Sequence, residues 1–220
     1  MELGEAIRTR KSIRAFLPDP IPRETLTKIV DLARWAPSWA NTQPWEVVVA
    51  DGEKTRELGR LFQQEVSGGA GPRTDIEIPV AWPEVYKNRY VGLGRDLLAF
   101  IGIQRDDKEG RTQHYMNMYN FFGAPAVVYL IMDAGLSVPY ACLDIGSFGT
   151  TLCLAAHAEG LGTIFLASVT HFPDIIRRVL AIPETKKIVI GIAIGRPHPD
   201  APANLFRSSR VPVEEILRFA

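Results

Sequence analysis

The sequence predicts an α+β protein in which a mixed sheet is covered by helices on both faces. Two observations favour this fold class. The segments at 124–132 and 187–195 are apolar at nearly every position, as strands are when both faces of their sheet are buried. Helical and extended patterns also alternate along the chain, with prolonged irregular connections between them. With 220 residues, the chain suits a single domain, residues 1–220, with a substantial core.

The elements follow in order from apolar periodicity and from the prolines and glycines that interrupt it. The N-terminal segment predicts a short helix that ends near Arg8. Further helices are predicted at 22–35, 53–66, 108–122, 140–159 and 172–180. Strands are predicted at 45–50, 124–132, 163–167 and 187–195. From 196 to 212 we expect an extended tail, and from 213 to 219 a short terminal helix.

Residues 67–107 are the least regular part of the chain. The segment 67–75 reads as a glycine-rich linker, and W-P-E-V-Y-K-N-R-Y at 82–90 is rich in aromatic residues. We therefore expect 67–107 to be an irregular excursion packed on a partner subunit or serving as a lid.

The segment 140–159 is the most strongly predicted helix. Ile145, Phe148 and Leu152 follow the helical period, while Gly146 and Gly149 leave the other side small rather than charged. A helix that is apolar nearly all round must be covered nearly all round. We expect it at the centre of the subunit and in contact with a symmetry mate.

Composition excludes several partners and compartments. Lys plus Arg and Asp plus Glu each number 25, so the formal charge is zero and neither a nucleic acid nor an anionic membrane is favoured as a partner. The acidic N-terminus lacks the pattern of a secretory signal, which predicts a cytoplasmic protein. Cys142 and Cys153 lie about three helical turns apart, so a disulfide between them is excluded and we expect two small buried hydrophobic residues.

The first candidate site is the basic turn, residues 8–14, which reads R-T-R-K-S-I-R. Arginine offers a planar fork of N–H donors that matches phosphate oxygens, lysine adds a point charge, and a serine hydroxyl adds one more donor. The cluster is either a phosphate site or a solvated basic turn. The second candidate is the amide loop, residues 37–43, in which hydroxyl and amide side chains follow Pro37 and precede P-W.

Several chemistries lack their sequence signature. No glycine fingerprint for a dinucleotide, no phosphate-binding loop for a nucleoside triphosphate and no G-x-S-x-G elbow is present. The histidines at 114, 157, 171 and 198 are scattered, without metal-ligand spacing, so we expect no metal. Any hard chemistry would have to come from an organic cofactor.

The order of the motifs resembles the FMN-dependent nitroreductase family. The shared features are the basic turn, P-S-x-x-N-x-Q-P-W, the small-residue helix, A-E-G-L-G-T, G-I-A-I-G-R-P and a basic tail. The resemblance implies a three-layer sandwich with a mostly antiparallel sheet, and a homodimer whose C-terminal tails extend onto the partner subunit. It also implies FMN at the subunit interface, NADH or NADPH as electron donor, and ping-pong hydride transfer to small acceptors such as nitroaromatics or quinones.

Carried over by position, the resemblance implies no catalytic side chain and a set of FMN contacts. Arg10 and Ser12 would meet the phosphate together with Arg210, and either Arg207 or Ser208 would complete that site. Ser208 stands where relatives carry a lysine before the final arginine. The amide loop would reach the flavin from the other subunit, and the segment 167–170 would lie along the ring, with a backbone N–H at flavin N5. The implied cofactor-binding residues are Arg10, Lys11, Ser12, Arg14, Pro37, Ser38, Trp39, Asn41, Gln43, Asn117, Asn120, Ala167, Ser168, Val169, Thr170, Arg207 and Arg210.

Two alternatives stay open. A reductive dehalogenase or flavin-processing enzyme shares the scaffold, although the substrate-clasping Glu/Tyr/Lys signature of the dehalogenases is not recognisable here. A non-enzymatic FMN-binding protein would hold flavin without oxidising NAD(P)H.

Overall fold

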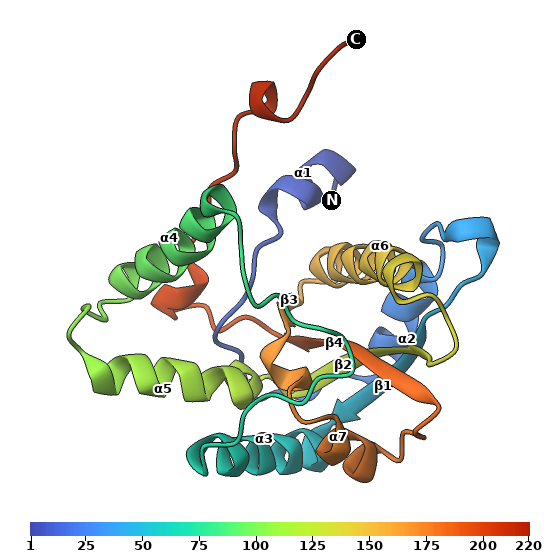
Figure 1. Cartoon of the computed structure of the whole chain (residues 1–220), viewed down its shortest axis with the longest axis horizontal. Coiled ribbons are helices and arrows are strands. Elements are labelled where there is room, and N and C mark those ends of the chain that lie inside the picture. The colour runs from blue at the N-terminus through green and yellow to red at the C-terminus, as the bar shows by residue number, and fades with distance from the viewer.

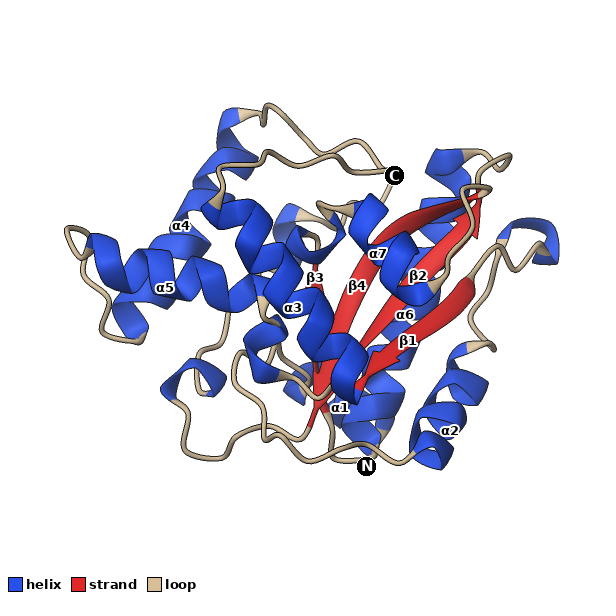
Figure 2. Ribbon diagram, turned by 90° about the horizontal axis from the view of Figure 1, so that it is seen from below, coloured by secondary structure: helices blue, strands red, loops and turns tan.

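The computed structural model describes residues 1–220, and its helices and strands are arranged in three layers (Figures 1 and 2). The helices are α1 (Leu3–Thr9), α2 (Arg23–Ala33), α3 (Gly52–Ser67), α4 (Glu84–Phe100), α5 (Lys108–Tyr119), α6 (Val138–Ala158) and α7 (Pro173–Leu180). The strands are β1 (Glu46–Asp51), β2 (Ala126–Asp133), β3 (Gly162–Leu166) and β4 (Lys186–Gly195). Short 3-10 turns include η1 (Trp39–Asn41), η2 (Phe121–Gly123), η3 (Ser168–Thr170), η4 (Pro202–Asn204) and η5 (Val213–Glu215).

The strands form one sheet in the order β1-β2-β4-β3, and each neighbouring pair is antiparallel. A parallel element comes from the isolated bridge between Ser12 and Thr163, which adds the basic turn to the β3 edge. The predicted α+β class with a mostly antiparallel sheet is confirmed.

Strand β2 shows why the sheet is covered on both faces. Its alternate residues enter two separate cores, one under α2 and α6 and the other under α3, α5 and α7 (Figure 1). Ala126, Val128, Leu130 and Met132 belong to the first core, and Val127, Tyr129 and Ile131 to the second. Because side chains alternate across a strand, an all-apolar strand needs a partner layer on each side. The prediction of a central strand from its continuous apolar sequence is confirmed.

Helix α6 packs along one face of the sheet, with Ile145, Phe148 and Leu152 buried beneath it. By length and composition alone this helix is apolar enough to cross a membrane, but 44% of its apolar window is buried within the fold. Core helices of globular proteins have this composition because both of their sides are covered. Tyr140 and Leu143 remain exposed on its outer side, at 57% and 67%.

Two predicted segments were wrong. Residues 84–100 form helix α4 and not an irregular excursion. Only Leu97 of this helix is buried, so its apolar residues are not confined to one face and give no helical period. The predicted terminal helix at 213–219 is reduced to the single turn η5, because nothing packs against Ile216 and Phe219, which are 72% and 92% exposed. After η4 the tail passes along α4, and only its end beyond η5 projects away from the rest of the chain (Figure 1).

Candidate functional site

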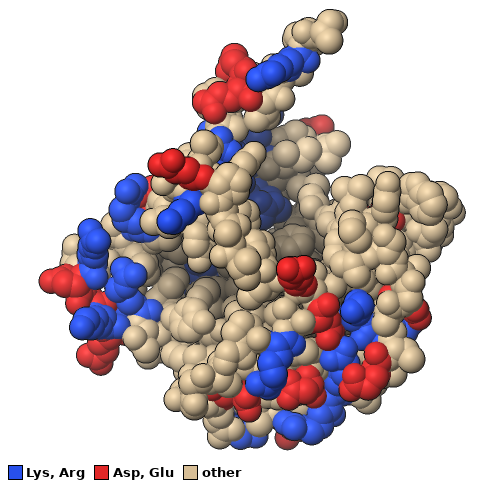
Figure 3. Space-filling view, in the orientation of Figure 1, with Lys and Arg blue, Asp and Glu red and all other residues tan.

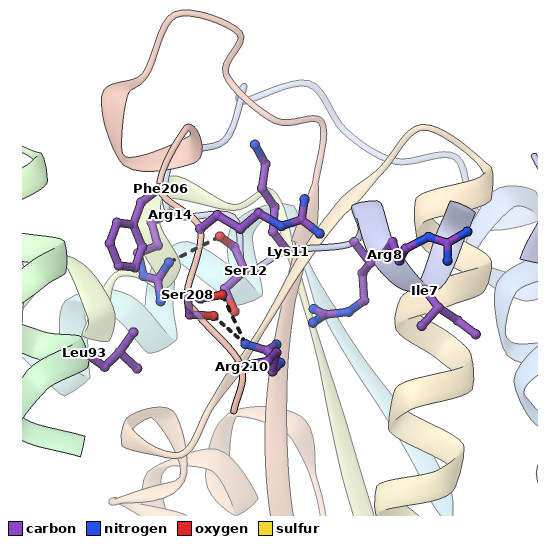
Figure 4. A pocket seen from close by; sticks show the side chains of 11 residues that line it. Ile7, Arg8, Lys11, Ser12, Arg14, Leu93, Phe206, Ser208 and Arg210 are labelled. Atoms are coloured by element: carbon purple, nitrogen blue, oxygen red, sulfur yellow. Dashed lines mark hydrogen bonds between the residues drawn. The ribbon is translucent and has the colours of Figure 1, made fainter. Parts of the chain in front are cut away.

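The basic turn and the tail meet in one cavity of about 360 Å³, which we call the cation cavity. Six of its lining residues carry positive charge and none carries negative charge. Its wall is completed by Ile7 and Arg8 of α1 on one side and by Leu93 of α4 with Phe206 on the other (Figure 4). The lining residues are Ile7, Arg8, Arg10, Lys11, Ser12, Arg14, Leu93, Phe206, Arg207, Ser208 and Arg210. Residues from both ends of the sequence therefore form one local positive site.

The sheet edge fixes the basic turn. The backbone N–H of Ile13 donates to the carbonyl of Thr163 at 3.0 Å, and Ser12 forms the parallel bridge to the same residue. A Cβ on Gly162 would lie 2.5 Å from Ile13 Cγ1, so only glycine lets the turn approach β3 this closely. Because Ser12 sits on the sheet edge, its position depends on rigid structure rather than on a free loop.

Asn204 joins the tail to the basic turn. Its Oδ1 accepts from the backbone N–H groups of Arg14 and Ala15 at 2.8 and 3.1 Å. Its Nδ2 donates to the carbonyls of Ala15 and His198 at 2.8 and 3.0 Å. The amide is buried and all four of these bonds go to backbone, so it holds η4, and the tail residues after it, against the basic turn.

The cations of the cavity have no acidic partners. No salt bridge within 4.0 Å involves any of the six, whereas Arg73, Arg177 and Lys186 elsewhere each pair with carboxylates. Arg14 donates to the carbonyl of Ser12 at 3.3 Å, and Arg210 donates to Ser208 Oγ at 2.8 Å (Figure 4). Burial lowers the pKa of the Arg14 guanidinium, which still stays charged at neutral pH. Such a set matches a multiply charged anion and above all a phosphate.

Two histidines border this positive charge. His157 of α6 places Nε2 2.8 Å from Thr9 Oγ1, and that hydroxyl donates to the carbonyl of Glu5. Burial is the largest cause of the lowered pKa of His157, followed by the charge of Arg10, while Glu5 opposes it. For His114 of α5, burial and then the charge of Arg14 lower the pKa. Both rings are therefore neutral at pH 7, and the cavity keeps arginine and lysine as its charged groups.

The amide loop lies outside the cation cavity. Ser38 Oγ accepts from the backbone N–H of Gln43 at 3.0 Å, and Gln43 Nε2 donates to the carbonyl of Asn41 at 3.3 Å. Ala40, Asn41 and Gln43 have φ angles of 48°, 57° and 46°, in the left-handed region that non-glycine residues rarely adopt. Trp39 is 65% exposed, so the loop presents its side chains outward from the chain.

A buried acid holds the amide loop. Both carboxylate oxygens of Asp144, on α6, lie 3.1 Å from the donating backbone nitrogen of Trp39. The Trp39 ring packs on Tyr140 of the same helix, with 5.7 Å between ring centroids. Left-handed residues cost free energy and persist only where the surroundings over-determine them. Asp144 supplies that constraint, so the strained loop is a preformed feature.

The segment 167–170 follows β3 and is anchored from below. Val169 is buried and its carbonyl accepts from Tyr129 Oη at 3.4 Å, while a Cβ on Gly191 of β4 would lie 2.4 Å from Val169 Cγ2. Thr170 Oγ1 donates to the carbonyl of Ala167 at 2.8 Å. Ser168 Oγ is buried and has no hydrogen-bond partner in the chain. A buried hydroxyl without a partner marks a place where a ligand would satisfy it.

The two predicted asparagines of α5 differ in their surroundings. Asn117 is half-buried and its Oδ1 accepts from Gln113 Nε2 at 2.9 Å. Asn120 lies at the end of α5 against α3, where a Cβ on Gly59 would meet its Oδ1 at 2.7 Å. Neither residue lines the cation cavity, and the packing of Asn120 against α3 is a structural role that the sequence did not indicate.

Sequence reasoning missed several contributors to the site. Leu93 lines the cavity from α4, and Phe100 of the same helix packs on Phe206 of the tail with 5.6 Å between ring centroids. Asn204 gave no signal, because its partners are backbone groups far away in the sequence. Asp144 did give a sequence signal, because an acidic residue in an otherwise apolar helix is rarely buried without a hydrogen-bond partner. No group of three or more His, Cys, Asp or Glu side chains is placed to hold a metal ion.

A three-layer α+β fold whose chain ends enclose an unpaired cation cluster defines a class of protein with a site suited to a phosphorylated ligand. The chain belongs to the nitroreductase family, whose sequence model, described as Nitroreductase family, matches residues 7–196. The family prediction made from the motifs is therefore confirmed.

Individual relatives agree with this assignment. The chain is similar to a 4-nitrobenzoate reductase of Pseudomonas putida, at 32% identity over 95% of this chain and 91% of the relative. It is also 32% identical to a nitroreductase, NfnB, of Mycolicibacterium smegmatis, over 97% of this chain and 91% of the relative. Among solved structures, an FMN-dependent nitroreductase NfnB from Mycobacterium smegmatis in complex with NADPH superposes with a TM-score of 0.92. It is 29% identical and the match covers 99% of this chain and 97% of that one.

Proposed function

We propose that the protein is an FMN-dependent NAD(P)H oxidoreductase that reduces nitroaromatic compounds. The observation that carries the proposal is the cation cavity, in which six unpaired cations and two serines converge from both ends of the chain. The relatives named for nitrobenzoate reduction and the structure holding NADPH support the same assignment.

The donor set of the cavity fits the phosphate of FMN. Arg10 and Arg210 would bind the phosphate oxygens, Ser12 would donate one more hydrogen bond, and Lys11 and Arg14 would add charge. Ser208, bonded to Arg210 Nη1 at 2.8 Å, orients that guanidinium, and Arg207 lines the same cavity. The sequence left open which tail residue completes the site, and this arrangement favours Arg210 oriented by Ser208.

The ring of the flavin would lie between the segment 167–170 and α5. Ser168 Oγ lacks a partner, so a polar ring atom would satisfy it, and Asn117 offers an amide to the pyrimidine edge. Ala167 is exposed at the start of this segment, while Val169 and Thr170 are buried as its anchors. FMN held by these residues would supply the hydride-transfer chemistry between NADH or NADPH and the acceptor.

The protein's own groups bind and orient both substrates. No acid–base pair or nucleophile stands in the site, so hydrogen bonds and positive charge are its means of stabilising reduction. Donor and acceptor would use the same position in turn, which is a ping-pong scheme, and quinones would be accepted as well as nitroaromatics. A cytoplasmic location would suit an enzyme that uses NAD(P)H. The two free cysteines are compatible with this location.

A homodimer would complete the site, with the amide loop of one chain reaching the flavin of the other. The loop is exposed and held by hydrogen bonds, yet it lies outside the cavity of its own chain. Tyr140 and Leu143 of α6 expose apolar surface, as do Ile216 and Phe219 of the tail. The surface over α6 carries few charges, whereas basic atoms show in the hollow between α4 and α6 (Figure 3). These faces suit a second copy, onto which each tail would extend.

The proposal is tested on purified protein under anaerobic conditions. We expect a yellow protein whose visible absorbance is bleached by NADPH or NADH and restored by 4-nitrobenzoate. A colourless protein that takes up no added FMN would contradict the proposal. Bound flavin that no nicotinamide reduces would indicate a non-enzymatic FMN-binding protein, and preferential turnover of 3-iodotyrosine would indicate a reductive dehalogenase.

A further inference from the structure

A chain of three hydrogen-bonding side chains links α5 to the residue that follows η3. Tyr115 Oη lies 2.9 Å from Tyr119 Oη, and Tyr119 Oη lies 2.9 Å from His171 Nδ1. Tyr115 is 44% exposed, whereas Tyr119 is buried at 1%. The chain therefore runs from the surface into the core and ends on His171.

The protonation states restrict the chain of hydrogen bonds to two directions. Burial, and then the hydrogen bond with Tyr115, raise the pKa of Tyr119 well above its usual value, while burial lowers the pKa of His171. At neutral pH the tyrosine keeps its proton and the histidine is uncharged. With the ring proton on Nε2, His171 Nδ1 accepts from Tyr119 and Tyr119 accepts from Tyr115; with the proton on Nδ1, both bonds run the other way. In either direction every group of the chain has a partner.

The Tyr119 hydroxyl adds something that packing alone does not need. Its ring already contacts Phe172 and His171, with centroid distances of 6.2 and 5.9 Å, and a phenylalanine would make the same contacts. The hydroxyl contributes only the two hydrogen bonds. Burying a hydroxyl without using it would be costly, so its partners give the reason for a tyrosine at this position.

His171 controls the segment that would face the flavin. Its backbone N–H donates to the carbonyl of Ser168 at 3.2 Å, which closes η3. Its backbone carbonyl accepts from the N–H of Arg73 at 2.8 Å. With the backbone bonded on both sides and the ring held by Tyr119, His171 is fixed relative to α5, the helix that also carries Asn117.

We propose that Tyr119 is a positioning residue, whose hydroxyl sets the segment 167–170 at a fixed distance from α5 and so shapes the flavin ring site. This inference rests on the proposed function, because the segment matters to catalysis only if FMN lies there. The positioning itself is a property of the folded chain and is measurable without flavin.

The first test uses flavin-free protein and amide hydrogen exchange. In Tyr119→Phe, exchange of residues 167–171 should be about tenfold faster than in the wild type, since the hydrogen bonds to His171 and Tyr115 are both lost while the ring stays the same size. Tyr115→Phe is the matched control, with less than about twofold acceleration, because water replaces its exposed hydroxyl. Unchanged exchange at 167–171, or equal acceleration throughout the protein, would overturn the proposal.

The second test uses flavin-loaded protein. Tyr119→Phe should keep its FMN affinity within about threefold, because the cation cavity is untouched, while the rate constant for bleaching by NADPH falls about tenfold. His171→Asn, which keeps an acceptor in place of Nδ1, should stay near the wild type, and His171→Leu should resemble Tyr119→Phe. Additive losses in the double variant Tyr119→Phe/His171→Leu would contradict a shared role. A colourless wild-type protein would contradict the proposed function. The role of Tyr119 would then be decided by the hydrogen-exchange result alone.

Discussion

The cation cavity and the amide loop are built by opposite means. The cavity consists of charge, brought together from the two ends of the chain and clamped by Asn204. The amide loop consists of backbone conformation, with three left-handed residues held by the buried Asp144. The first is a cavity within one chain, whereas the second is an exposed, hydrogen-bonded loop whose residues do not line that cavity. The difference teaches that the two regions need different partners, and in the proposed homodimer a second copy would bring them together.

Both regions store unfavourable free energy. Unpaired cations repel one another in the cavity, since no carboxylate offsets them. Each left-handed residue of the loop costs about 1 kcal/mol, which its hydrogen bonds must offset. A ligand with a phosphate at one end and a polar ring at the other would offset the repulsion between the cations of the cavity. Its ring would also be a binding partner for the strained loop.

The largest expected effect comes from removing charge from the cavity. In Arg10→Ala/Arg210→Ala, the dissociation constant for FMN should rise about a thousandfold, because two charge-assisted hydrogen bonds to phosphate are lost. Fluorescence titration measures it. Riboflavin, which lacks the phosphate, should bind wild type and variant equally.

The matched control is Arg56→Ala/Arg111→Ala, which removes the same charge from exposed positions outside the cavity. Its FMN affinity should change less than about threefold. Equal weakening of FMN and riboflavin by the Arg10/Arg210 pair would place the flavin's phosphate elsewhere.

Mixed dimers test whether the loop acts on the other subunit. One subunit carries Arg10→Ala/Arg210→Ala and the other carries Ser38→Ala/Asn41→Ala, each with its own affinity tag. If the loop of each chain completes the partner's site, one of the two sites is intact and about half of the wild-type NADPH oxidation returns. Mixed dimers no more active than the two parental dimers would show that the loop serves its own chain.

A smaller effect is expected from releasing the loop. Asp144→Ala leaves the Trp39 N–H without its acceptor, and the free energy of unfolding should fall by about 1–2 kcal/mol. Urea unfolding measures this, and Trp39 fluorescence should shift as its contact with Tyr140 loosens. Asp106→Ala, at an exposed acid, should leave both unchanged.

The reciprocal variant is Asn204→Ala, which should weaken FMN binding about tenfold and leave the Trp39 fluorescence unchanged. If Asp144→Ala weakened FMN binding in a dilute, monomeric sample as much as Asn204→Ala does, the two regions would not be separate.

The same contrast explains how much the sequence predicts. The arginine, lysine and serine side chains of residues 8–14 predict an anion site from residue type alone. The continuous apolar runs of β2 and β4 predict the central strands of the sheet. The clamps stay hidden, because Asn204 bonds to the backbone N–H of Arg14, 190 residues away. Backbone partners leave no trace in the residue types, so only the fold reveals such a contact.

Helix α4 shows the opposite limit. Its sequence contains Gly92 and Gly94 and follows Pro79 and Pro83, which are typical of irregular chain. A sequence shows helical periodicity only when apolar residues are confined to one buried face of the helix. In α4 only Leu97 is buried. Because most apolar residues of α4 are not buried within the chain, they do not follow a helical period, and the sequence gives no sign of the helix.

The smallest effect concerns acid stability next to the cavity. The pKa of His157 is lowered in the folded chain, first by burial and then by Arg10, so its contribution to stability is present above about pH 6.5 and is lost as the pH falls towards the lowered value. In His157→Gln, which keeps a donor for Thr9, the melting temperature at pH 5.5 should rise relative to the wild type, because glutamine takes up no proton on unfolding. The rise should be only about 1 °C, because the histidine is only partly buried. A bound phosphate would offset the charge of Arg10, so FMN should shrink the difference between the two proteins. A difference that persists in saturating FMN would mean that the phosphate lies too far from His157 to affect it, and would move the proposed contact from Arg10 towards the tail.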